Sequence, residues 1–196
     1  HLTDRLSTAT LLHFENRQMD HDGNDDGFMD MPKLRQYNIM HRWAYVSPRW
    51  ISQLMVRALH DERKGGQSLK HTNTDSAELP YSTSVKTNRY EMQWKNGFTL
   101  NSDHNTSVAL MMHGSWHDAD NIFGMTQYDV TQKNGYAQLM FETDINEHNN
   151  ISVGASLNHD YYDERFNPLG AMPDAGSKAT KETTTGLYAQ YTYKLG

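Results

Sequence analysis

The chain has 196 residues, with 18 Lys and Arg against 24 Asp and Glu, and this formal net charge of −6 argues against nucleic acid as a partner. Its hydrophobic fraction of 36% and mean hydropathy of −0.84 are too low for an ordinary water-soluble core, yet its aromatic fraction of 11% is too high for a disordered acidic chain. No run approaches the ~18 apolar residues of a membrane helix, and the absence of cysteine excludes disulfides and thiolate metal sites.

Apolar and polar residues alternate in segment after segment, which predicts β-strands because successive side chains of a strand point to opposite faces. A weak first strand lies within residues 7–15, with Leu12 and Phe14 on one side. The clearest strand is 89–100, where the odd positions include Arg89 and Glu91 and the even positions are mostly apolar. In chain order, eight strands are predicted within residues 7–15, 36–45, 50–58, 89–100, 108–116, 137–145, 151–161 and 187–193.

The predicted connections alternate between long and short. The short ones fall at 46–49, 101–105 and 146–150. Trp43, Tyr45 and Trp50 flank the first of these and suit an interfacial aromatic girdle. Two-faced strands with alternating connections are typical of an all-β, antiparallel up-and-down transmembrane β-barrel, in which periplasmic turns are tight and extracellular loops are long. The long extracellular loops are predicted at about 17–32, 60–83, 117–135 and 161–184.

Two smaller architectures remain as alternatives. Eight strands could close a complete small β-barrel, or they could form a soluble β-sandwich that acts as a binding or structural module. The charges of Arg57, Arg89 and Glu91 in mid-strand suit a wet lumen. The last residues, 193–196, read as the start of another periplasmic turn. We therefore expect about eight strands of a larger barrel, with both ends on the periplasmic side.

Several segments resemble a known family. The run 20–32, followed by 36–38 and 42–45, resembles the first half of the barrel of TonB-dependent outer-membrane receptors from Bacteroidetes. Further matches are the segments 63–67, 123–129 and 186–193. The resemblance covers nearly the whole chain in order, and within the family it is most similar to the cobalamin transporter branch.

The resemblance implies a barrel of about 22 strands in the bacterial outer membrane, with an N-terminal plug domain that this chain does not contain. The TonB complex would act through that plug to import a scarce nutrient. Cobalamin or another corrinoid is the favoured cargo, ahead of ferric siderophore, haem or copper. Outer-membrane lipid and a surface lipoprotein are further expected partners.

The first long connection contains the sharpest local signal, the spacing of an EF-hand calcium loop. At its twelfth position Lys33 replaces the usual bidentate Glu, so a site here would be weaker or would borrow Asp20 or Asp25. The alternative is a solvated acidic turn. Because the family resemblance implies calcium-organised extracellular loops, structural calcium is the predicted cofactor. The candidate ligands are Asp22, Asn24, Asp26, Phe28 through its carbonyl, and Asp30, with Gly27 at the turn.

Two other segments are candidates for ligand contact. His117 and Asp118 form a compact polar group, although a polar loop would look the same. Tyr128, Tyr161 and Tyr162 suit a planar, partly apolar ligand, although girdle aromatics would look the same. These five residues are the predicted substrate-binding set.

Catalytic signatures are absent from the sequence: it has no G-x-S-x-G, no H-E-x-x-H and no phosphate loop. His113 and Ser115 lie two apart on one strand face, which does not establish a base and a nucleophile. The sequence therefore predicts a protein that is not an enzyme.

Overall fold

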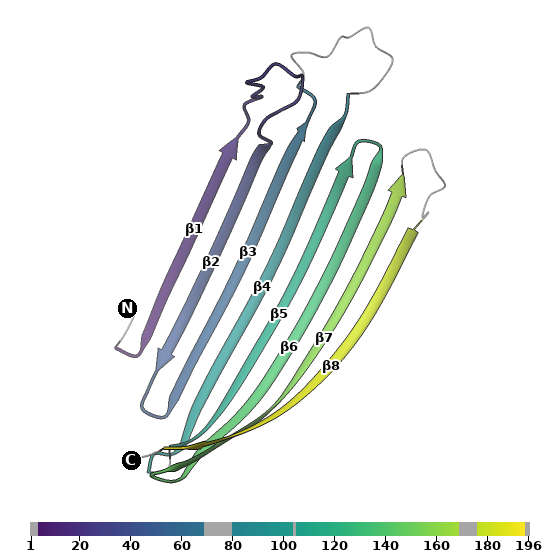
Figure 1. The fold of residues 1–196 in the computed structure, drawn as a ribbon. Helices are drawn as coiled ribbons and strands as arrows, with labels where there is room; N and C mark the ends of the chain where they lie inside the picture. Colours follow the sequence, from purple (N-terminus) through teal and green to yellow (C-terminus); the bar gives the residue numbers. More distant parts are fainter. Residues whose placement is uncertain (1–3, 69–79, 104, 169–175, 195–196) are drawn as a thin grey trace.

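The computed structural model describes residues 4–68, 80–103, 105–168 and 176–194. Within them the chain forms one sheet of eight antiparallel strands, each paired with its neighbours in sequence (Figure 1). No helix in these ranges has the length and apolarity needed to cross a membrane. The strands are β1 (Leu6–Arg17), β2 (Lys33–Val46), β3 (Trp50–Gly66), β4 (Ser82–Asn101), β5 (Thr106–Phe123), β6 (Thr126–Asn146), β7 (Asn149–Pro168) and β8 (Gly176–Tyr193).

This topology confirms the predicted all-β, up-and-down class. Among the described residues β1 and β8 are the two edges of the sheet, so it is not closed into a barrel. The described strands also form a single layer, whereas a β-sandwich requires two sheets packed face to face.

The strand register separates the side chains into two faces, which we call the apolar face and the polar face. Trp94 pairs with Leu54 of β3 and with Met112 of β5, so these three side chains share the apolar face. The neighbouring residues point the other way and are mostly polar. Along the sheet the apolar face carries Leu12, Phe14, Ile39, Trp43, Leu54, Val56, Tyr90, Met92, Trp94, Phe98, Val108, Leu110, Met112, Trp116, Leu139, Phe141, Val153, Leu157 and Leu187.

No second layer of the described chain packs against this apolar face. The buried hydrophobic residues of the described chain are Leu34, Ala119 and Val130. Leu139 is 53% exposed and Leu187 is 87% exposed, although both point to the apolar face. Exposed apolar surface of this extent indicates that the face contacts another protein or a membrane.

The strands extend well beyond the apolar segments of the sequence, which corrects the predicted loops. The connection expected at 117–135 is wrong, because β5 and β6 run through it and turn at Gly124 and Met125. In this part of the sheet, the face that is apolar elsewhere carries polar residues such as the paired Asp120 and Asp129. The alternation of apolar and polar residues is therefore lost, although the backbone pairing continues. For the same reason β3, β4, β7 and β8 extend into the predicted loops 60–83 and 161–184, whereas the first connection lies within 17–32 as expected.

The connections at the long-loop end contact one another. The backbone N–H of Met29 donates to the carbonyl of Gly66 at 2.9 Å, and that of Ser68 donates to Gly27 at 2.8 Å. Further along, the N–H of Gly124 donates to Ser82 at 2.8 Å. The first connection, the end of the β3–β4 hairpin and the β5–β6 turn therefore form a continuous rim.

Candidate functional site

A hydroxyl–carboxylate cluster lies on the polar face near the long-loop end. The hydroxyl of Tyr128 on β6 donates to the Glu164 carboxylate at 3.0 Å and lies 3.1 Å from the hydroxyl of Tyr162 on β7. The hydrogen bond to Tyr162 is the largest cause of a raised pKa at Tyr128, and the hydrogen bond to Glu164 is the second. Tyr128 lies outside the apolar segments of the strands. The phenol therefore stays protonated and the cluster can both donate and accept hydrogen bonds.

His117 lies on the same face as this cluster and in the same cross-strand row as Tyr162, since both pair with Gln132. Asp118 and Tyr161 point to the other face. Asp118 accepts a 2.7 Å hydrogen bond from Thr131. The five predicted residues therefore do not form one site: the polar face carries three of them and the apolar face carries two.

Sequence reasoning missed three charged residues beside the predicted tyrosines. Glu164 completes the cluster with Tyr128, and Lys133 and Lys181 lie beside Tyr161. The period of two along β7 puts Tyr162 and Glu164 on one face. The sequence predicts this only if residues 162–164 are assigned to a strand, whereas they were expected in a loop. The two lysines come from β6 and β8, and only the register joins them.

Closer to the short turns, the polar face carries a network of charges. The Glu91 carboxylate accepts from Arg57 at 3.3 Å and from Arg89 at 2.7 Å, and Arg57 also donates to Asn38 at 3.2 Å. The Glu91 side chain is only 12% exposed, and two guanidinium groups compensate its charge. Glu91 is thus paired with Arg57 on the neighbouring strand and with Arg89 on its own strand.

The predicted calcium loop is folded around its own carboxylates. Asp22 accepts from the N–H of Gly27 at 3.0 Å, and Asp30 accepts from the N–H of Gly23 at 2.7 Å. Asp26 accepts from the N–H of Phe28 at 2.8 Å. These hydrogen bonds shape the turn.

The same loop places its candidate ligands near one another, yet the donor set is not assembled as a metal site. Asp26 uses its second oxygen to accept from the Asn24 amide at 3.0 Å, and the Lys33 ammonium lies 4.0 Å from Asp20. Among the described residues, no group of three or more His, Asp or Glu is arranged to hold a metal ion. Calcium binding by this loop stays a prediction.

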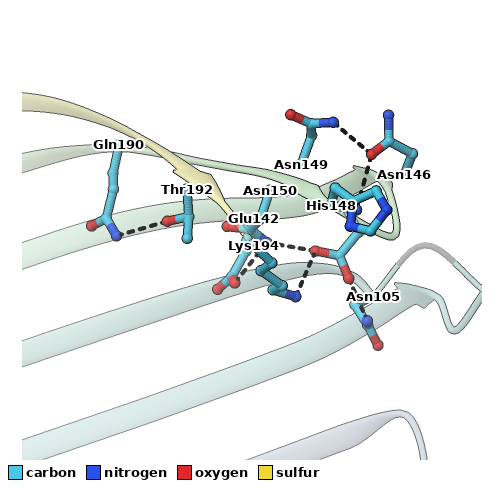
Figure 2. A network of polar contacts seen from close by, with 10 residues as sticks. Asn105, Glu142, Asn146, His148, Asn149, Asn150, Gln190, Thr192 and Lys194 are labelled. Carbon is cyan, nitrogen blue, oxygen red and sulfur yellow. Dashed lines mark hydrogen bonds and ion pairs between the residues drawn. The ribbon is translucent and has the colours of Figure 1, made fainter. Parts of the chain in front are cut away.

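A second polar network joins the hairpins at the short-turn end (Figure 2). The Asp144 carboxylate accepts from Asn105 at 2.5 Å and from Asn150 at 2.8 Å, and it lies 3.9 Å from the Lys194 ammonium. One acidic side chain of β6 thereby connects the β4–β5 turn, the start of β7 and the end of β8. This network is structural in character, because each member bonds within the protein.

Comparison of the chain with models of known protein families, with curated proteins and with solved structures gave no match.

Proposed function

We propose that the chain is part of the barrel wall of a TonB-dependent receptor in the bacterial outer membrane. The observation that carries the proposal is the single sheet with one exposed apolar face and one polar face carrying paired charges. Lipid would cover the apolar face, and a hydrated lumen would suit Arg57, Arg89 and Glu91.

The height of the apolar surface agrees with a lipid boundary. On β4 the apolar side chains extend from Tyr90 to Leu100, which is about 33 Å along a strand. At a strand tilt of about 40° this length spans about 25 Å along the membrane normal, which matches the apolar band of outer-membrane barrels. The strands continue beyond Tyr90 and would extend above the membrane surface.

Two tryptophan N–H groups on the apolar face donate to polar side chains of that face, which is how a low-dielectric environment accommodates such donors. The indole N–H of Trp94 donates to the Ser52 hydroxyl at 3.1 Å, and that of Trp50 donates to the Asn96 carbonyl at 3.3 Å. A face in water could leave such groups to the solvent. The cross-strand pairing of these polar side chains therefore supports lipid contact.

The open edges of the sheet support a larger barrel. Within the described residues β1 and β8 each have one unpaired edge, and exposed edges of this length promote uncontrolled strand pairing. Further strands of a barrel of about 22 strands would pair with both edges. A complete small barrel would require β1 to pair with β8, and the described residues contain no such pairing.

The whole receptor would import a scarce nutrient, with cobalamin or another corrinoid favoured over ferric siderophore, haem or copper. The TonB complex would act through a plug domain outside this chain, and a surface lipoprotein is a proposed partner. On the polar face, Tyr128, Tyr162 and Glu164 offer hydroxyl and carboxylate groups to a large polar cargo. Calcium in the first connection would be structural, holding that loop at the rim.

Binding by the full-length natural protein tests this proposal. We expect saturable binding of radiolabelled cyanocobalamin to outer membranes that contain the protein, and uptake that is lost when the proton gradient is collapsed. Haem and a ferric siderophore serve as competing cargos. Saturable binding of one of them instead would overturn the choice of cargo, while uptake that persists without the gradient would overturn TonB dependence.

A further inference from the structure

A row of aromatic and cationic residues crosses the apolar face where its apolar part ends. Tyr90, Trp116, Lys133, Tyr161 and Lys181 follow one another through direct pairing on β4, β5, β6, β7 and β8. Toward the short turns this face continues with Met112, Ala137 and Leu157, whereas toward the long loops it carries Asp118, Thr131 and Asp163. The row therefore lies at the boundary between the apolar and the polar surface.

Two positive charges of this row lie beside one aromatic ring. The Nζ atoms of Lys133 and Lys181 are each 5.7 Å from the ring centroid of Tyr161. The acidic residues in the next row of this face have other contacts, since Asp118 accepts from Thr131 and Asp163 lies 3.7 Å from Arg165. Within the described part of the chain neither ammonium forms an ion pair with a carboxylate, so both ammonium groups can bind an added anionic group.

A hollow of about 500 Å³ opens beside the two lysines. Lys133, Gly135, His159, Tyr161 and Lys181 contribute to its lining. A Cβ atom added to Gly135 would meet nothing within 4 Å, and the residue paired with it on β5 is Gly114. Because Gly135 has no side chain, the hollow beside the two lysines stays unfilled.

We propose that this hollow binds the phosphate-bearing headgroup of an anionic outer-leaflet lipid. The phosphate would lie between the ammonium groups of Lys133 and Lys181, and the attached acyl chains would run along the apolar face past Ala137 and Leu157. A lipid is favoured over free phosphate because the hollow adjoins the apolar surface. The inference rests on the proposed membrane location of this face.

Lipid retention by the full-length natural protein tests the site. The protein in detergent micelles is mixed with phosphatidylglycerol or phosphatidylcholine, and bound lipid is counted by native mass spectrometry. We expect one phosphatidylglycerol to be retained, with affinity about thirtyfold lower in the Lys133→Gln, Lys181→Gln double variant at low salt. The matched control is Lys95→Gln with Lys178→Gln, which removes the same charge from the polar face and is expected to change nothing.

A second variant separates shape from charge. Gly135→Leu keeps both lysines and fills the hollow, so it is also expected to lose the retained lipid. Equal retention of phosphatidylcholine, displacement by inorganic phosphate at the lipid's own concentration, or unchanged retention in the double variant would each overturn the inference. These outcomes leave the proposed function standing if the protein still inserts into vesicles, whereas failure to insert would overturn the proposed function itself.

Discussion

Trp50 and Phe98 stack across β3 and β4, with ring centroids 5.8 Å apart and ring planes within 5° of parallel. Tyr45 extends the group, since its ring centroid is 4.8 Å from that of Trp50. All three lie beside a short turn and point to the apolar face. In the proposed membrane location this cluster would belong to the interfacial girdle.

Replacing Trp50 should weaken the sheet at this end. Trp50→Ala removes the stacking and also the indole N–H that Asn96 accepts, and we expect the free energy of unfolding to fall by about 2 kcal/mol. Unfolding by urea in lipid vesicles measures the loss. Trp50→Phe keeps a ring without the N–H and should lose about half as much; equal losses in both variants would contradict the role of the stacking.

Asp144 should be the most sensitive residue of the short-turn network. Asp144→Ala removes the common acceptor of Asn105 and Asn150 and the partner of Lys194, and we expect a loss of about 1–3 kcal/mol in the free energy of unfolding (Figure 2). The same urea titration applies. Asp103→Ala removes a carboxylate from the neighbouring β4–β5 turn and is the control, since a loss of similar size there would show a general charge effect.

Tyr128 should contribute to cargo binding through its hydroxyl. Tyr128→Phe removes the donor to Glu164 and the contact with Tyr162, and we expect cargo affinity in the full-length protein to fall about tenfold. Equilibrium binding of labelled cargo measures the change. Tyr136→Phe removes another hydroxyl from the polar face, one that donates along β6 to Gln138, and it should leave affinity unchanged. Equal losses in the two variants would assign the effect to the face as a whole.

Calcium binding by the first connection is a prediction from sequence that calorimetry can test. We expect heat on titrating calcium into the full-length protein, and its loss in the Asp22→Ala, Asp26→Ala double variant. Because Asp22 and Asp26 also accept backbone N–H groups, this variant should loosen the loop even without calcium, which limited proteolysis would detect. Identical heats for the variant and the natural protein would exclude this loop as the site.

The two faces of each strand could be predicted because successive side chains point to opposite faces. If one face contacts lipid and the other water, apolar and polar residues alternate along the strand. The segment 89–100 shows this directly, and the register bears out its assignment of Trp94 and Met92 to the face opposite Glu91. Beyond Tyr90 both faces are polar, so the pattern disappears although the hydrogen-bonded ladder continues to Ser82. That loss explains the wrong loop at 117–135.

The candidate site was only partly predictable for a related reason. Tyr161 and Tyr162 are adjacent in sequence, and in an extended strand adjacency places them on opposite faces. The approach of Tyr128 to Glu164, and of Lys133 and Lys181 to Tyr161, depends on cross-strand register. The sequence pattern does not specify the pairing register of two strands where neither face is apolar.

The central claim is that the apolar face of the sheet contacts lipid and that the polar face contacts water. The chain has no cysteine, so single Cys residues carrying a spin label can be placed at successive positions from Arg89 to Phe98 of β4, with the protein reconstituted in lipid vesicles. The spin label should be highly accessible to oxygen at the even positions, which point to the apolar face. At the odd positions it should be highly accessible to a water-soluble nickel chelate. High nickel accessibility at Tyr90, Met92 and Trp94 as well would contradict the account.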